Sequence, residues 1–237
     1  MSDPTAAVRD EEARIRRAYE HRTGDSRYSW LNRGHQLIVQ GAERGILDAM
    51  RRAGVDSLHD RTILEVGCGT GQWLRAMVQW GARPSRIAGV DMLTDRIVAA
   101  RKLCAEAVAL SVGSAAALPF DDGTFDIVLQ STVFTSILDD GLRRLAASEM
   151  LRVLRPDGFI LWYDFFVDNP RNPDVRAVRK SELRALFPGC RTELRRTTLA
   201  PPLARRIAPR SWLAAAVLST VPLLCTHYVG TIRRSIR

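Results

Sequence analysis

From residue 61 onward the chain alternates short apolar runs with amphipathic stretches. The apolar runs are rich in Val, Ile and Leu and predict strands over residues 62–66, 86–91, 107–112, 125–129 and 159–163. The stretches between them carry apolar residues at helical spacing and predict helices over residues 71–80, 94–105 and 140–154. Strands that are apolar along their whole length are typical of a parallel sheet covered on both faces.

Both ends of the chain add to this alternation. Residues 8–22 and 35–53 predict two N-terminal helices, and the second half predicts a helix over 180–187, a strand over 192–198, a helical insertion over about 201–225 and a final strand near 227–232. The whole pattern indicates a Rossmann-like, doubly wound α/β sheet of about seven mostly parallel strands with the last strand antiparallel. We expect residues 1–60 to form an N-terminal helical cap and residues 61–237 to form one domain.

One segment could be taken for a membrane span. Residues 211–232 carry no formal charge over 22 positions, which is enough length to cross a bilayer as a helix. The run includes Pro222, His227 and Gly230, however, and these residues favour a short helix followed by a strand.

The composition indicates which class of protein this is and where we expect it to act. An apolar fraction of 46% and a charged fraction of 26% are ordinary for a globular protein. The four cysteines lie far apart and the first residues lack a signal-peptide pattern, so we expect a cytoplasmic protein. The net charge of +9 is concentrated at one end, because residues 171–237 hold 14 Lys and Arg against Asp174, Glu182 and Glu193. Such a tail allows peripheral contact with a membrane.

A glycine-rich turn follows the first apolar strand. In Glu65-x-Gly67-x-Gly69-x-Gly71 the absence of side chains lets the backbone approach a ligand closely, at the start of a helix. Asp91 ends the next strand, where a carboxylate can accept both hydrogens of a ribose diol. Trp73 stands where dinucleotide folds place a third glycine, and Glu65 suits a ligand ammonium group. These details favour S-adenosylmethionine over NAD.

On these motifs the chain resembles the class I S-adenosylmethionine-dependent methyltransferases, in the broad group that acts on small molecules. Residues 65–71 resemble the first motif of the family, Asp91 its ribose-binding acid, residues 113–120 its adenine loop, residues 125–130 its fourth strand and residues 154–158 the turn into its fifth. The adenine loop departs from the pattern, since Ser114 replaces the usual acid and would accept a weaker hydrogen bond. The resemblance implies S-adenosylmethionine as cofactor, bound by Glu65, Gly67, Cys68, Gly69, Gly71, Asp91, Met92, Ser114, Ala115 and Gln130.

Methyl transfer to a hydroxyl needs a base, and three residues are candidates. These are His35, His227 and Asp164, the last at the carboxyl end of the fifth strand. Residues 130–134 lack the Asn/Asp-Pro-Pro-aromatic box of enzymes that methylate amino groups. The carboxylates lack a metal-dependent pattern, so we expect no metal. In the loop before the second helix, Arg27, Tyr28 and Trp30 either close over the methionine end of the cofactor or pack against that helix.

The acceptor is expected to bind elements within residues 165–225. Residues 169–187 and 226–230 look similar to methyltransferases of glycan and cell-envelope biosynthesis, which implies O-methylation of a saccharide or other small-molecule hydroxyl, with Arg171, Asn172, Arg176 and Arg179 as polar contacts. Arg205, Arg206 and Arg210 beside the apolar run 213–224 also suit an anionic or lipid-linked acceptor. The alternatives are an RNA methyltransferase and a non-catalytic basic module. The scarcity of aromatic residues in the tail argues against nucleic acid as a partner.

Overall fold

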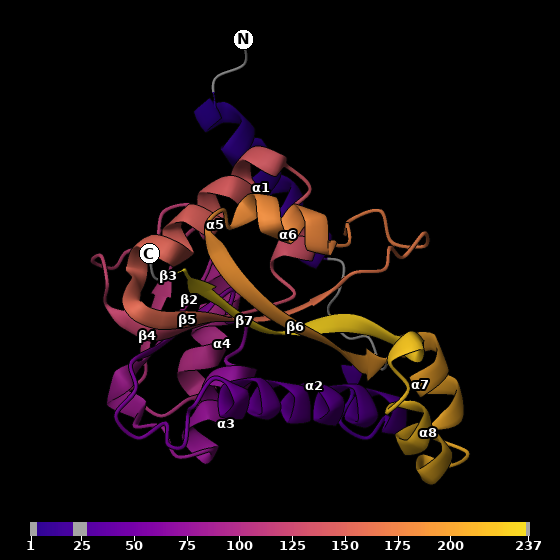
Figure 1. The fold of residues 1–237 in the computed structure, drawn as a ribbon. Coiled ribbons are helices and arrows are strands. Elements are labelled where there is room, and N and C mark those ends of the chain that lie inside the picture. The colour runs from indigo at the N-terminus through magenta and orange to yellow at the C-terminus, as the bar shows by residue number, and fades with distance from the viewer. Residues whose placement is uncertain (1–3, 21–27, 236–237) are drawn as a thin grey trace.

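A seven-stranded sheet forms the centre of the computed structural model, which describes residues 4–20 and 28–235 (Figure 1). The strands lie in the order β3-β2-β1-β4-β5-β7-β6. Their bounds are β1 Ile63–Val66, β2 Ile87–Asp91, β3 Ala109–Val112, β4 Phe125–Ser131, β5 Leu154–Phe165, β6 Cys190–Leu199 and β7 Cys225–Arg234. All pairs from β3 to β5 are parallel, whereas β7 runs antiparallel to both β5 and β6. The predicted Rossmann-like sheet with a final antiparallel strand is confirmed.

Helices cover both faces of this sheet. On one face lie α1 Pro4–Glu20, α5 Asp140–Val153 and α6 Lys180–Leu186, and on the other lie α2 Arg33–Arg52, α3 Gln72–Gln79 and α4 Thr94–Leu103 (Figure 1). Successive residues of β5 show why two cores form: Trp162 packs on Phe134 and Phe187 on one side, while Tyr163 packs near Trp73 on the other. The strands are therefore apolar on both sides.

The topology places a crevice at the carboxyl end of β1. The chain passes from β1 to β2 on one side of it and later to β4 on the other. In open α/β sheets ligands bind where the strand order reverses in this way. The glycine turn and Asp91 both lie at this edge, at the ends of β1 and β2.

The last part of the chain differs from the prediction in detail. Helices α7 Pro201–Ile207 and α8 Trp212–Leu218 lie between β6 and β7, as the expected helical insertion. The uncharged run 211–232 divides into α8, the 3₁₀ turn η4 Pro222–Leu224 and most of β7. In the part of the chain that the structure describes, no helix combines the length and apolar character needed to cross a bilayer.

The turn predicted at residues 154–158 is part of β5. Leu154 pairs with Phe125, and the register shifts before Phe159 pairs with Ile127. The strand therefore starts directly at the end of α5, and residues 155–158 interrupt its regular pairing with β4. At the other end, α1 spans Pro4–Glu20, and the last two residues of the predicted helix 8–22 fall outside the described residues.

Candidate functional site

The glycine turn is held between β2 and the loop after β4. Gly67, Gly69 and Gly71 have φ angles of +69°, +53° and +79°, which favour glycine over other residues. A Cβ atom at Gly67 would lie 2.5 Å from Val133 Cγ2, and one at Gly71 would lie 2.4 Å from Cys104 Sγ. The backbone N–H groups of Gly67 and Cys68 both donate to the Val90 carbonyl. Two of the three glycines are thus required by the protein's own packing.

Asp91 lies beside this turn and is nearly buried. Its Oδ2 accepts a hydrogen bond from Gly69 N at 2.8 Å and its Oδ1 accepts one from Leu93 N at 2.9 Å. A carboxylate offers about four acceptor sites, so each oxygen keeps one for a ligand. The backbone fixes this side chain in an orientation that a ribose diol can use.

A cavity of about 160 Å³ opens next to Asp91. Five of the predicted cofactor residues line it, namely Gly67, Asp91, Met92, Ser114 and Ala115. We call this cavity the cofactor cleft. Its other walls are the loop after β4, the start of α5 and one side of α1. Ser114 Oγ accepts from Ala116 N at 3.1 Å, which shapes the loop after β3.

Other predicted cofactor residues lie behind the wall of the cleft. Gln130 is fully buried and holds the loop after β4: its Oε1 accepts from Val133 N at 3.1 Å and its Nε2 donates to the Tyr163 carbonyl at 3.4 Å. Cys68 is buried, which raises the pKa of its thiol, and it packs next to Gly89. Gly69 and Gly71 belong to the turn without lining the cavity.

Glu65 is the unusual member of this group. It is 2% exposed, and its Oε2 has no hydrogen-bond partner among residues 4–20 and 28–235. Burial and the nearby Asp91 carboxylate raise its pKa well above the ordinary value. A buried carboxyl oxygen without a partner is costly, and the positive charge of a bound S-adenosylmethionine would offset that cost. The residues present therefore fit this cofactor.

The first helix covers the cofactor cleft, which the sequence patterns did not indicate. Glu12, Ile15 and Tyr19 of α1 line the cleft, and the Arg96 guanidinium lies 4.5 Å from the Tyr19 ring centre. Ile15 and Tyr19 are four residues apart on one helix face. That spacing is the feature of the sequence that could have indicated that α1 presents these two residues together.

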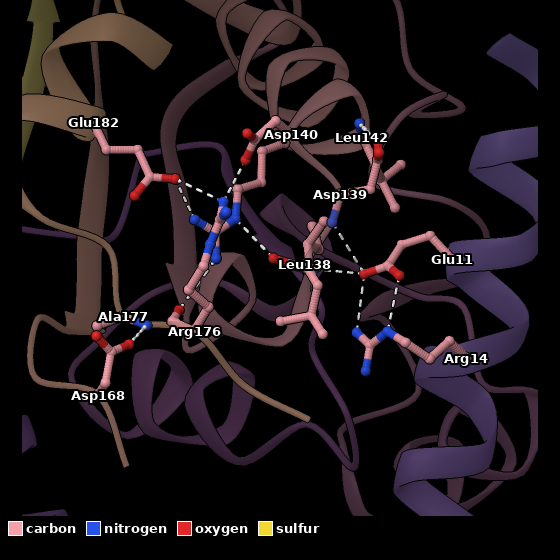
Figure 2. A network of polar contacts seen from close by, with 12 residues as sticks. Glu11, Arg14, Leu138, Asp139, Asp140, Leu142, Asp168, Arg176, Ala177 and Glu182 are labelled. Carbon is pink, nitrogen blue, oxygen red and sulfur yellow. Dashed lines mark hydrogen bonds and ion pairs between the residues drawn. The ribbon is translucent and has the colours of Figure 1, made fainter. Parts of the chain in front are cut away.

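Polar contacts fasten α1 to the start of α5 (Figure 2). Glu11 accepts from Leu138 N at 2.5 Å and Asp139 N at 3.4 Å, and it pairs with Arg14. Arg14 in turn donates to the Ser136 carbonyl at 2.6 Å. Because these hydrogen bonds favour the charged form, the pKa of Glu11 is lowered despite its partial burial.

The three predicted bases lie at different places, and none lines the cofactor cleft. His227 is buried and stacked on Tyr163, and burial lowers its pKa to about 4. His35 lies in the first turn of α2, half-buried, where burial and Arg205 lower its pKa. Asp164 faces the opposite side of the sheet from His227 and is bound there by Thr135.

Of the three base candidates, Asp164 is connected to the cofactor cleft through the fewest contacts. Thr135 donates to it through Oγ1 at 2.7 Å and through its backbone N–H at 3.2 Å, and the next residue, Ser136, lines the cleft. Burial raises the pKa of Asp164 to about 7, against the lowering effect of these hydrogen bonds. This carboxyl can therefore take up or release a proton near neutral pH.

A second cavity, of about 480 Å³, lies on the other side of the α5 start. Charged residues line it, among them Asp140, Arg143, Arg144, Asp168, Arg176, Arg179 and Glu182. Figure 2 shows Arg176 between the carboxylates of Asp140 and Glu182, and both ion pairs are formed. Of the predicted acceptor contacts, Arg176 and Arg179 lie here, whereas Asn172 accepts from Asp174 N within its own loop.

The aromatic residues before α2 lie away from the cofactor cleft. The rings of Tyr28 and Trp30 contact His35 at 5.9 and 5.7 Å, so they pack against α2. Arg27 lies outside the described residues. Among the residues that are described, no three His, Cys, Asp or Glu side chains are grouped to hold a metal ion.

Comparison with known sequences decides the family. The family described as "Methyltransferase domain" matches residues 63–158, which run from β1 into β5 and include the glycine turn and Asp91. Over these residues the chain is a class I S-adenosylmethionine-dependent methyltransferase domain. The cofactor of this family is S-adenosylmethionine.

Curated relatives match about half of the chain. It is 31% identical over 123 residues to a demethylmenaquinone methyltransferase of Shouchella clausii, covering 48% of each chain. It is 33% identical over 115 residues to the enzyme of the same name from Roseiflexus castenholzii, covering 48% of this chain and 45% of the relative. The chain thus spans about half the length of the curated relatives it matches.

Solved structures share the fold over most of the chain. A chain of the complex between Haloferax volcanii Trm112 and a methyltransferase aligns with a TM-score of 0.62 at 19% identity, covering 84% of this chain and 91% of that one. An S-adenosylmethionine-dependent methyltransferase from Mesorhizobium loti aligns with a TM-score of 0.59 at 17% identity, covering 80% and 98%. The [4+2]-cyclase SpnF also aligns, with a TM-score of 0.59 at 20% identity, covering 84% and 83%. At these identities the likeness concerns the fold alone.

Proposed function

We propose that this chain transfers a methyl group from S-adenosylmethionine to a hydroxyl of a small molecule. The proposal that S-adenosylmethionine is the cofactor rests on the two carboxyl groups at the glycine turn. Asp91 keeps free acceptor sites for the ribose hydroxyls, and Glu65 has a buried oxygen without a partner. Bound S-adenosylmethionine supplies an electrophilic methyl group, and the chain has to align the acceptor with it.

The titration of Glu65 allows a test of S-adenosylmethionine as cofactor that does not depend on activity. Burial and Asp91 raise the pKa of this carboxyl in the empty site, and a cationic ligand would lower that pKa again. Binding should therefore release protons at pH values that lie between the pKa of the empty site and the pKa of the bound site. Calorimetry in buffers of different ionisation enthalpy measures this release, which should disappear in Glu65→Gln. Equal proton release in wild type and variant would contradict the assignment.

For the acceptor we propose a saccharide or another small molecule with a free hydroxyl. The demethylmenaquinone methyltransferases among the relatives support a small-molecule acceptor. The charged cavity beside the cofactor cleft offers Arg176, Arg179 and Asp168 as hydrogen-bonding partners for a polar group. An anionic or lipid-linked form of such an acceptor is compatible with the basic C-terminal part of the chain.

For the base we propose one of His35, His227 and Asp164, and we favour Asp164. Its pKa of about 7 suits proton transfer at neutral pH, and Thr135 connects it to the wall of the cleft. At least one of His35→Ala, His227→Gln and Asp164→Asn should lose turnover and keep its affinity for S-adenosylmethionine. Near-normal rates in all three would show that alignment alone drives transfer.

The activity is tested with S-adenosylmethionine labelled in its methyl group. The chain is incubated with monosaccharides, with phenols and quinols, and with polyribonucleotide as a comparison. We expect label in one of the hydroxyl-bearing small molecules. Label in the polyribonucleotide would support the RNA methyltransferase alternative. SpnF shows why the test is needed, since a protein described as a cyclase shares this fold.

A further inference from the structure

Helix α8 turns two apolar side chains, Leu213 and Val217, toward solvent, while Trp212 and Leu218 pack half-buried on its inner side. Leu213 is 75% exposed and Val217 is 57% exposed, while Ala215 is the α8 residue that is buried. Leu223 in the turn η4 that follows is 83% exposed. The outer face of a surface helix in a globular protein normally carries charged and polar residues, whereas here it carries Leu and Val. Residues 211–224 hold no charge to cover this apolar surface.

A second exposed apolar segment adjoins α7 and α8. Trp30 and Leu31, just before α2, are 54% and 91% exposed. The start of α2 packs directly on α7, since a Cβ at Gly34 would lie 2.5 Å from Arg205 Cα. Arg33 donates to the Pro209 carbonyl at 3.5 Å. Residues about 180 positions apart thus form one end of the molecule, at the N-terminal end of α2 and around α7 and α8 (Figure 1).

Among the described residues that form this end, the charges are all positive. Arg33, Arg206 and Arg210 are exposed there. The sequence has no Asp or Glu over residues 28–42 or 194–235. Exposed apolar side chains with cations beside them, and with no acid beside them in the described part of this end, are complementary to an anionic lipid surface. The apolar residues enter the acyl boundary there, and the arginines contact phosphate.

We propose that this end of the molecule docks on anionic phospholipid bilayers. The docking surface comprises the exposed apolar side chains of residues 30–31 and 213–223, together with Arg33, Arg206 and Arg210. It lies at the carboxyl end of β6, which runs parallel to β5, and so at the same sheet edge as the cofactor cleft. A molecule dissolved in the membrane would therefore meet the edge of the sheet at which the cleft opens. The proposal does not depend on methyl transfer.

Vesicle flotation of the full chain tests this proposal without any substrate. Phosphatidylcholine vesicles with about 30% phosphatidylglycerol should bind the chain at low salt. Pure phosphatidylcholine vesicles should bind it at least tenfold more weakly, and about 0.5 M salt should remove most of the binding to anionic vesicles.

Two double variants separate the contribution of the apolar side chains to vesicle binding from that of the arginines. Leu213→Ser with Val217→Ser should weaken partitioning about tenfold, because two apolar side chains no longer enter the bilayer. Arg206→Gln with Arg210→Gln should weaken it by about tenfold or more on anionic vesicles. All four side chains are exposed, so circular dichroism should show an unchanged fold.

Helix α4 provides matched controls. Val98 and Leu103 are exposed apolar residues on it, and Arg101 and Lys102 are exposed cations. Val98→Ser with Leu103→Ser, and Arg101→Gln with Lys102→Gln, should bind vesicles as the wild type does. Equal losses in these controls would overturn the proposal, as would equal binding to neutral and anionic vesicles or no binding to either. If Leu213→Ser converts a dimer to a monomer in light scattering and leaves vesicle binding unchanged, the surface joins two copies of the chain instead.

Discussion

Replacing Asp91 by Ala removes the proposed ribose acceptor and two backbone contacts at once. Hydrogen bonds to a charged group contribute about 1.5–3 kcal/mol, so the dissociation constant for S-adenosylmethionine should rise about 10- to 150-fold. Ser114→Ala removes a neutral, partly exposed hydroxyl that contributes about 1 kcal/mol, so it should raise the constant only about fivefold. Isothermal titration calorimetry measures both.

The same substitution also affects the fold, and a second variant separates the two effects. Without the carboxylate, the backbone N–H groups of Gly69 and Leu93 lose their acceptor, which should lower the melting temperature. Asp91→Asn keeps one acceptor oxygen and should regain part of this stability while still binding S-adenosylmethionine weakly. The control is Asp95→Ala, an exposed carboxylate in the first turn of α4, which should change the affinity by less than about twofold.

Two results would refute the reasoning about Asp91. Equal losses of affinity in Asp91→Ala and Ser114→Ala would show that the ribose acid lies elsewhere. A loss in Asp95→Ala as large as that in Asp91→Ala would show that overall charge, and not the fixed carboxylate at the end of β2, governs binding.

Three further predictions follow from the site. Gly69→Val should abolish S-adenosylmethionine binding in titrations, whereas Gly54→Val, at a glycine that also has a positive φ but has nothing within 4 Å of an added Cβ, should only lower the melting temperature. Burial lowers the pKa of His227 to about 4, so the folded state binds fewer protons than the unfolded state between pH 4 and 6.5, and the free energy of unfolding should fall by up to about 3 kcal/mol as pH decreases through that window. Urea titrations at several pH values should show this loss reduced in His227→Gln and unchanged in the exposed control His59→Gln. Asp164→Asn should remove a step near pH 7 from the turnover profile if this carboxyl is the base.

The cofactor cleft could be predicted from the sequence where local signals coincide. The glycine turn, Asp91 and the loop at Ser114 each follow an apolar strand, and parallel strands bring their carboxyl ends to one edge. The placement of Met92 and Ala115 in the same wall follows from the same rule. These positions depend on strand order alone, which the alternation of strands and helices indicates.

The role of α1 could not be predicted in this way. Glu11 binds the backbone of Leu138, 127 residues further along the chain, and Arg14 reaches the Ser136 carbonyl. Such contacts depend on how a terminal helix folds back over the sheet. The local spacing of apolar residues does not indicate where that helix will lie. Gln130 was predicted to bind the cofactor from its place in the chain. In the structure its side chain hydrogen-bonds to the backbone of Val133 and Tyr163, behind the wall of the cofactor cleft.

The base candidates show a further limit of sequence reasoning. Asp164 and His227 lie on neighbouring strands, yet the alternation of side chains along a strand points them to opposite faces of the sheet. Position along the sequence placed Asp164 at the carboxyl end of the fifth strand, where the structure has it. The separation of the two side chains follows from the exact pairing of β5 with β7, which is set by tertiary structure.

The central claim is that the cleft at the glycine turn binds S-adenosylmethionine. Calorimetric titration of the purified chain with S-adenosylmethionine, with its demethylated product and with NAD tests it most directly. We expect binding of the first two with dissociation constants on the order of micromolar, no measurable binding of NAD, and loss of binding in Gly69→Val. Binding of NAD in that range with no binding of S-adenosylmethionine would contradict it.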